Sequence, residues 1–94
     1  VKVFIRSLEK STISKVLRSL DLLERFGNNL GLPHSKSIGN GLFELRIRGV
    51  QEVRLLYIFH NGAVILLGFK KKSTAIPQQI LDTVLRKKRA IDSI

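Results

Sequence analysis

The stretch that decides the fold is LFELRIRGVQEVRLLYIFHNGAVILLGFKKK, residues 42–72. In its opening run the apolar residues alternate with Glu44, Arg46 and Arg48. A period of two is typical of a β-strand, whose successive side chains point to opposite faces. The run therefore predicts a strand with one apolar face and one face that carries an acid and two arginines.

Two more strands follow in the same stretch. The apolar runs Val53 to Phe59 and Ala63 to Phe69 each have ordinary strand length, and His60-Asn61-Gly62 separates them. Asn-Gly supplies the positive φ angles that a tight hairpin turn needs. We therefore expect a small antiparallel sheet, with Arg54 and the lysines of residues 70–72 on it or beside it.

Helical periodicity marks the first part of the chain. Apolar spacing over Val1 to Leu8 predicts a short first helix, and alternation over residues 1–5 leaves a strand open as the alternative. A second helix is expected from about Thr12 to Phe26, with Ser11 or Thr12 as its N-cap and Gly27 as its end. Its apolar stripe consists of Ile13, Val16, Leu17, Leu20, Leu23 and Phe26.

The remaining segments connect and complete the fold. Asn28 to Gly41 is rich in glycine and other turn-forming residues, and we expect an irregular loop. After the sheet, residues 73–76 form a link and Pro77 begins a last helix, where its missing N–H costs nothing. The chain is therefore predicted to be an α+β domain with two N-terminal helices, a sheet and a C-terminal helix. The side chains expected to meet in one core are Leu17, Leu20, Leu45, Ile47, Leu55, Leu66 and Val84.

The charge of the chain is its most informative bulk property. The 94 residues, which we expect to form a single domain over 1–94, contain 17 Lys and Arg against 7 Asp and Glu, a net charge of +10. Such a surplus indicates an anionic partner, namely a nucleic acid, an acidic protein or a membrane surface. Membrane binding is disfavoured, because no apolar run approaches the roughly 20 residues of a membrane span and no basic helix has a broad aromatic face.

Several kinds of chemistry are disfavoured by composition. The chain has no cysteine, which excludes disulfides and thiol catalysis and fits a reducing, cytoplasmic location. Its two histidines, His34 and His60, lie in separate loops, so we expect no metal site and no cofactor. Both histidines are more typical of solvated loop residues than of catalysts.

Three short motifs carry a resemblance to a known family. They are Leu-Pro-x-Ser-Lys at Leu32–Lys36, Phe-Glu-Leu-Arg at Phe43–Arg46 and Gly-Phe-Lys-Lys-Lys at Gly68–Lys72. In this order and spacing, the sequence resembles the RelE/ParE superfamily of bacterial toxins, and more narrowly its phage-derived, HigB-like branch, over about residues 1–91. The resemblance implies helices packed on one face of a curved antiparallel sheet of three to four strands. It also implies a strand before the first helix, which here would precede Val1.

The resemblance implies a function as well. It predicts the toxin of a type II toxin–antitoxin system, a metal-independent endoribonuclease that cleaves mRNA on the ribosome. Its expected partners are mRNA, the ribosome and a cognate antitoxin, often a helix-turn-helix protein, with no membrane and no small-molecule cofactor. Two alternatives stay open: a ParE-like toxin that poisons gyrase without nuclease activity, and an inactive basic module that binds RNA or antitoxin.

Site residues follow from the resemblance position by position. The expected catalytic residues are Glu44, Arg46, Arg54, Lys70 and Lys72. The expected RNA-binding residues are Lys36, Arg48, Lys71, Arg86 and Lys88, the last two of which equally fit a solvated helix end. For Glu44 the alternative is an exposed salt bridge with Arg54, and alternation places Tyr57 on the core face as a structural residue. Many HigB-like members have a histidine where this chain has Leu67, so the general acid stays unassigned.

Overall fold

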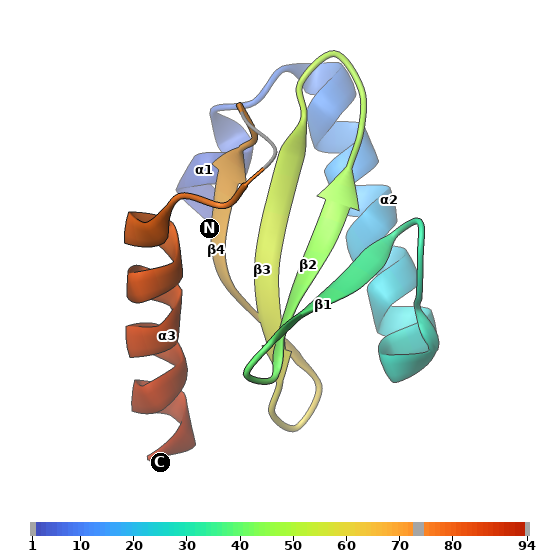
Figure 1. Ribbon diagram of the computed structural model, residues 1–94. Helices are drawn as coiled ribbons and strands as arrows, with labels where there is room; N and C mark the ends of the chain where they lie inside the picture. The colour runs from blue at the N-terminus through green and yellow to red at the C-terminus, as the bar shows by residue number, and fades with distance from the viewer. Residues whose placement is uncertain (1, 73–74, 94) are drawn as a thin grey trace.

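A computed structural model describes residues 2–72 and 75–93 of the chain and shows the α+β architecture that the sequence predicts (Figure 1). Val1, the first residue of the expected first helix, and residues 73 and 74 of the expected link lie outside the described residues. The elements are α1 (Lys2–Arg6), α2 (Lys10–Phe26), the 3-10 turn η1 (Gly27–Asn29), β1 (Ser35–Gly39), β2 (Leu42–Ile47), β3 (Val53–Phe59), β4 (Ala63–Lys70) and α3 (Gln78–Asp92).

The sheet is an antiparallel meander in which the strands lie in chain order, β1-β2-β3-β4 (Figure 1). Its register places Leu45 opposite Leu55 and Arg46 opposite Arg54. The turn between β3 and β4 is the predicted one, since Asn61 and Gly62 have φ of 55° and 103°. The bounds predicted for β3 are confirmed, and those for β4 differ by one residue.

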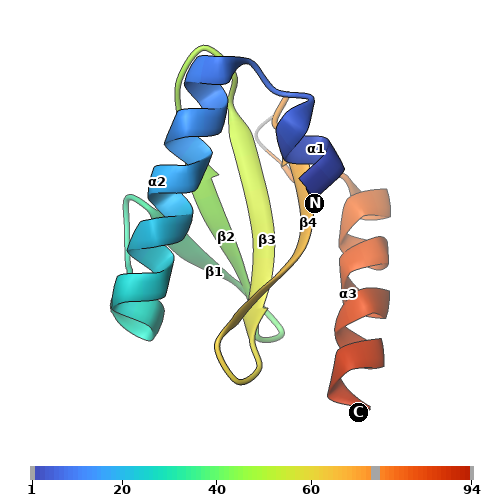
Figure 2. The same cartoon turned by 180° about the vertical axis from the view of Figure 1, so that it is seen from behind.

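Helices cover both faces of the sheet. On one face, α1 and α2 pack against the alternate side chains of β2 and β3, among them Leu45, Leu55 and Tyr57. On the other face, α3 packs through Val84 on a second cluster that includes Leu56. Figure 2, seen from behind, shows α1 and α2 on the side of the sheet away from α3. The central strand β3 therefore divides two hydrophobic clusters. We call the one under α1 and α2 the α2 cluster and the one under α3 the α3 cluster.

The expectation of a single core with helices on one face is therefore wrong. Leu66 and Val84 belong to the α3 cluster, whereas Leu45 and Leu55 belong to the α2 cluster. Leu17 lies in neither cluster and is 56% exposed. The sheet contacts only one side of α2, and Val16 lies on that side. Successive residues of an α-helix are rotated by about 100°, so Leu17 points away from the sheet.

The strand β1 was not expected, because the segment from Asn28 to Gly41 was predicted to be an irregular loop. In the structure, Ser35–Gly39 pairs with β2. The turn-forming residues lie at the end of the strand rather than within it: Gly39, Asn40 and Gly41 have φ of 92°, 56° and 74° and form the turn into β2.

The helix boundaries agree with the prediction at one end of α2 and differ at the other. Residues 2–6 are helical, so the strand alternative for the start of the chain is wrong. Helix α2 begins at Lys10, and its N-cap residue is Glu9 without a side-chain cap, not Ser11 or Thr12. Its end is as predicted: Gly27 has φ 52° and donates its N–H to the Leu23 carbonyl.

Gly68 of β4 is where α1 packs directly on the sheet. A Cβ at this position would lie 2.6 Å from a ring carbon of Phe4 and 2.8 Å from a side-chain carbon of Leu55. Gly68→Ala is therefore expected to lower the free energy of unfolding by about 1–3 kcal/mol through overpacking, measured by urea titration. Gly31→Ala is the control, since nothing lies within 4 Å of its added Cβ, and equal effects of the two changes would contradict this account.

Candidate functional site

The charged residues of β2 and β3 meet on the α3 face of the sheet. Alternation turns Glu44, Arg46 and Arg54 away from the α2 cluster, as the sequence predicts. Arg46 lies directly opposite Arg54, so two guanidinium groups share one cross-strand position. Glu44 precedes Arg46 by two residues and so shares its face of β2. It lies opposite Leu56 on β3 and Lys36 on β1.

Two carboxylates compensate the paired guanidinium groups. One oxygen of Glu44, Oε1, lies 3.4 Å from Arg46 Nε and 3.5 Å from Arg54 Nε. Arg54 Nη1 lies 3.2 Å from Glu52 Oε2 and donates to the Val53 carbonyl at 3.0 Å. We call these four residues, Glu44, Arg46, Glu52 and Arg54, the arginine cluster. It holds two cations at one place on a rigid sheet.

Most of the arginine cluster is buried, although a strand face that carries an acid and two arginines would ordinarily face solvent. Glu44 is 4% exposed and Arg54 is 2% exposed, so the alternative of an exposed salt bridge between them is wrong. Arg54 lies on the central strand between Arg46 and Phe69, and Phe69 belongs to the cluster under α3. Arg46, with a side chain 19% exposed, is the arginine that reaches the surface.

The cluster leaves hydrogen-bonding capacity unused. The Nε atoms of Arg46 and Arg54 are buried, and neither has a hydrogen-bond partner among the described residues. Both lie close enough to Glu44 for an ion pair, but not in the geometry of a hydrogen bond. Buried donors without partners are uncommon in folded proteins, and a catalytic or binding role is one of the recognised reasons for them.

The lysine run begins at the same end of the sheet as the two arginines. Phe69 pairs with Arg54, and Lys70 follows it, opposite Val53. Because Val53 points to the α2 face, the register places Lys70 on that face too. Lys71 donates its N–H to the Glu52 carbonyl at 2.8 Å and so returns to the α3 side by alternation. Lys72 is exposed.

The residues expected to bind RNA do not form one surface. Lys36 is exposed beside Glu44, and Arg48 is exposed just after β2. Arg86 is exposed on α3, where it contacts the Thr83 hydroxyl at 3.4 Å. Lys88 is half-buried and pairs with Asp92 at 2.7 Å. The structure thus brings Lys36 to the arginine cluster and leaves Arg86 and Lys88 on the C-terminal helix.

A basic cleft between α2 and the end of β2 was not predicted. It has a volume of about 290 Å³. Lys15 and Arg18 of α2, which lie outside its apolar stripe, line it together with Arg46. The full lining of this basic cleft is Lys15, Arg18, Ser19, Leu22, Pro33, His34, Arg46, Ile47 and Arg48. The only signal in the sequence is the spacing of Lys15 and Arg18, three residues apart on one helix.

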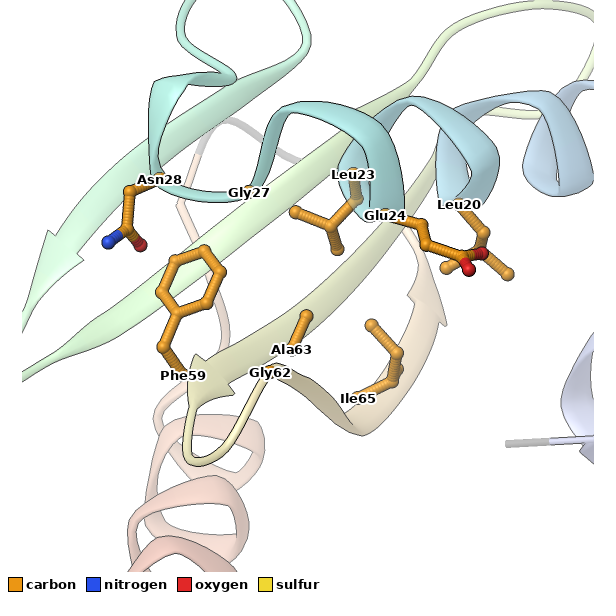
Figure 3. Close-up of a pocket in the computed structure, with 9 residues that line it drawn as sticks. All are labelled: Leu20, Leu23, Glu24, Gly27, Asn28, Phe59, Gly62, Ala63 and Ile65. Carbon is orange, nitrogen blue, oxygen red and sulfur yellow. The ribbon is translucent and has the colours of Figure 1, made fainter.

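A larger pocket with fewer charged residues lies between the end of α2 and the β3–β4 hairpin (Figure 3). Its volume is about 590 Å³, and Leu20, Leu23, Phe59 and Ile65 point toward it. Glu24 is the one ionisable residue among those that line it. A pocket with a single carboxylate at its rim lacks the groups that phosphate chemistry needs, so the candidate site is the arginine cluster.

Tyr57 lies in the α2 cluster, on the core face that alternation predicts, and stacks on Phe43 with ring centroids 5.5 Å apart. Its hydroxyl and that of Ser35 hydrogen-bond to each other across the buried interior. Burial raises the pKa of Tyr57 above its usual value, and the Ser35 hydrogen bond lowers it by less. The phenol is therefore held neutral and serves the fold.

Stability at alkaline pH is expected to depend on this phenol. Above pH ~10 the unfolded chain loses the Tyr57 proton while the folded protein keeps it, so stability falls with rising pH. Tyr57→Phe is expected to be less stable by about 1–3 kcal/mol at neutral pH, since Ser35 loses its partner. The difference should shrink above pH ~10. Tyr57 is the single tyrosine, so tyrosinate absorbance during unfolding reports on it alone, and a constant difference would contradict the assignment.

The part of the chain that the structure describes has neither a metal site nor a membrane span. Among residues 2–72 and 75–93, no three His, Cys, Asp or Glu side chains gather so as to hold a metal ion. Within the same ranges, no helix has the length and apolar character needed to cross a membrane.

Comparison with known proteins places the chain in a family. Neither a search of curated proteins nor a search of solved structures found a match. A family model described as phage-derived protein Gp49-like (DUF891) matches residues 3–89, nearly the whole chain, including the arginine cluster and the lysine run. The chain therefore belongs to the phage-derived Gp49-like family, which is associated with RelE and toxin-like proteins.

Proposed function

We propose that this protein is the toxin of a type II toxin–antitoxin system and that it cleaves mRNA, resembling the HigB-like branch. The observation that carries the proposal is the arginine cluster, which holds two guanidinium groups at one position of a rigid sheet with Arg46 at the surface. Membership of a toxin-associated family and the net charge of +10 support it. A guanidinium binds phosphate oxygens with paired donors.

The chemistry requires no metal, because RNA carries its own nucleophile, the 2′-hydroxyl beside the scissile phosphate. The 2′-oxygen bonds to phosphorus as the bond from phosphorus to the 5′-oxygen breaks, which leaves a 2′,3′-cyclic phosphate. An enzyme then needs to align that hydroxyl while its proton passes to water, neutralise the charge that develops on the phosphate, and supply a proton to the departing 5′-oxygen. We assign the non-bridging oxygens to Arg46, with Arg54 fixed behind it. Lys72, which is exposed at the same end of the sheet, would donate a proton to the leaving oxygen, whereas Lys70 lies on the opposite face of the sheet.

Burial redefines the role of Glu44. A carboxylate that is 4% exposed and faces two guanidinium groups is closed to a ribose hydroxyl unless the ion pairs open. We therefore assign Glu44 to positioning rather than to proton transfer. Its carboxylate fixes the side chain of Arg46, whose other nitrogens stay available to the substrate.

The proposed partners follow from the same surface. Lys36 of β1, which lies opposite Glu44, and Arg46 of β2 form a basic region that mRNA on the ribosome would contact. A cognate antitoxin, expected to be a helix-turn-helix protein, would inhibit by laying an acidic segment over this region. The proposed place of action is the cytoplasm, where translating ribosomes are found.

One observation favours a second candidate, a gyrase-directed toxin without nuclease activity. Of the residues expected to be catalytic, Glu44 and Arg54 are buried, and a purely structural ion-pair network would look the same. An inactive basic module that binds RNA or antitoxin fits that burial equally well. All three candidates use the positive surface but differ in what the protein does to its target.

Primer extension on cellular mRNA after induction separates these candidates. The nuclease proposal expects new mRNA 5′ ends within minutes of induction, before growth stops. Purified protein should leave gyrase supercoiling activity unchanged. Growth arrest with intact mRNA and inhibited gyrase would replace the proposal with the second candidate. If neither mRNA cleavage nor gyrase inhibition were observed, the inactive module would be favoured.

A further inference from the structure

The basic cleft has the composition of an anion site. Lys15 and Arg18 of α2, Arg46 of β2 and Arg48 just after β2 contribute four cations, and His34 adds a fifth basic group. None of the described residues that line the cleft is acidic, and Arg46 is the one of its four cations that lies within ion-pair distance of Glu44. A concave site lined by charges of one sign concentrates the field and attracts an anion.

The cations of the cleft are held in place by the fold. Lys15 Nζ donates to the Arg48 carbonyl at 3.2 Å and so ties α2 to the end of β2. The missing side chain of Gly49 makes room for this contact, because a Cβ there would lie 2.6 Å from Lys15 Nζ. Arg18 follows Lys15 by three residues and therefore shares its side of α2.

The cleft adjoins the candidate cleavage site through Arg46. This side chain lines the cleft, and its Nε faces Glu44 in the arginine cluster. Pairing between β1 and β2 extends only from Leu42 to Leu45, followed by one hydrogen bond from Arg46 N–H to the His34 carbonyl at 2.8 Å. The edge of β2 is therefore not covered by β1 beyond Arg46. At this point an RNA strand could pass from the α3 face of the sheet toward α2.

We propose that the basic cleft binds a backbone phosphate of the same RNA strand that the arginine cluster cleaves, next to the scissile position. This inference rests on the proposed function. The charge of the cleft suits a phosphate group, since four of its lining residues are cations and none is acidic. The RNA would bend around Arg46, with one phosphate on each side of it.

Binding of a non-cleavable RNA tests this directly. The probe is a fluorescein-labelled 2′-O-methyl oligonucleotide of about 12 nucleotides, whose affinity is measured by fluorescence anisotropy across a series of salt concentrations. Arg18→Gln is expected to weaken binding about tenfold and to reduce the slope of log affinity against log salt by about one phosphate contact, ~0.7 for a single strand. Lys15→Gln should act similarly, and circular dichroism would check that both variants fold.

The chain offers a matched control and a variant that keeps every charge. Arg25→Gln removes one cation from the same helix, where Arg25 is exposed and pairs with Asp21 at 3.7 Å outside the cleft, and should change affinity less than about twofold. Gly49→Ala displaces the end of Lys15 without altering the net charge. It should weaken RNA binding by more than the control does, because the effect is local rather than a property of total charge.

The outcomes are distinct. If the parent protein binds RNA and Arg18→Gln matches Arg25→Gln in affinity and salt slope, the inference is wrong while the proposed function stands. If the Arg18→Gln effect appears but primer extension shows no cleavage, the phosphate site stands and the nuclease assignment fails. If Arg18→Gln weakens binding of a glutamate-rich peptide and leaves RNA binding intact, the cleft serves an acidic protein and the inference is overturned.

Discussion

Arg54→Ala is expected to lower the free energy of unfolding by about 3–5 kcal/mol, as measured by urea titration. Arg54 is 2% exposed and lies within ion-pair distance of both Glu44 and Glu52. Its removal leaves the buried Glu44 carboxylate with Arg46 as its one ion-pair partner among the described residues. An incompletely compensated buried charge destabilises a protein more than the intact pair stabilises it, so the loss exceeds that of a surface salt bridge.

A paired variant distinguishes this account from lost packing. Replacing both charges with apolar side chains, Glu44→Leu with Arg54→Met, should recover much of the stability that Arg54→Ala loses. Arg46→Ala should cost less, about 1 kcal/mol, because its side chain is partly solvated. A loss below about 1 kcal/mol for Arg54→Ala would show that the buried ion pairs contribute little to the fold.

Arg46→Ala is expected to slow mRNA cleavage by about 100- to 1000-fold, under the proposed function. That is the usual effect of removing one donor that stabilises charge in a transition state. Arg46 is the arginine of the cluster that reaches the surface, so its loss should affect catalysis far more than stability. The rate would be measured on a defined mRNA in a translating extract, and Arg46→Lys should restore only part of it, since lysine lacks paired donors.

Arg86→Ala is the matched control for this experiment. Arg86 is also a surface arginine, but it lies on α3 and contacts Thr83 rather than the cluster. It should weaken RNA or ribosome binding modestly and leave the chemical step unchanged. If Arg46→Ala cleaved mRNA as fast as the parent protein, the assignment of the phosphate to Arg46 would be wrong and the gyrase-directed alternative would gain support.

The elements predicted correctly are those with strong local signals. Alternation between residues 43 and 48 and the Asn61-Gly62 turn are sufficient to define β2 and the hairpin that follows it. Strand β1 has no such signal, because its five residues, SKSIG, are mostly polar and small. It pairs because β2 presents an edge beside it, a tertiary cause that a local pattern does not contain.

The faces of the site residues were predictable, but their burial was not inferred. Alternation correctly separates Glu44 and Arg46 from the α2 cluster. The missed signal lies in β3, whose sequence VRLLYIF is apolar at almost every position, a pattern typical of a strand covered on both faces. An arginine inside such a run is expected to be buried and paired, and Arg54 is both.

The basic cleft required the fold itself. Lys15 and Arg18 lie about thirty residues before Arg46 and Arg48, and only the packing of α2 on β2 brings them together. On the helix alone they read as solvated cations, which is what most charged residues on a helix surface are.

The meander order of the sheet has a consequence for how the chain folds during synthesis. Each strand pairs with its neighbour in sequence, so the sheet needs only short loop closures. Helices α1 and α2 leave the ribosome before the strands on which they pack, and a five-residue helix such as α1 has little stability alone. The apolar stripe of α2 is therefore expected to stay exposed to solvent until β2 and β3 have left the ribosome. We therefore expect stable structure to form first in the β-meander, and the helices to pack on it afterwards.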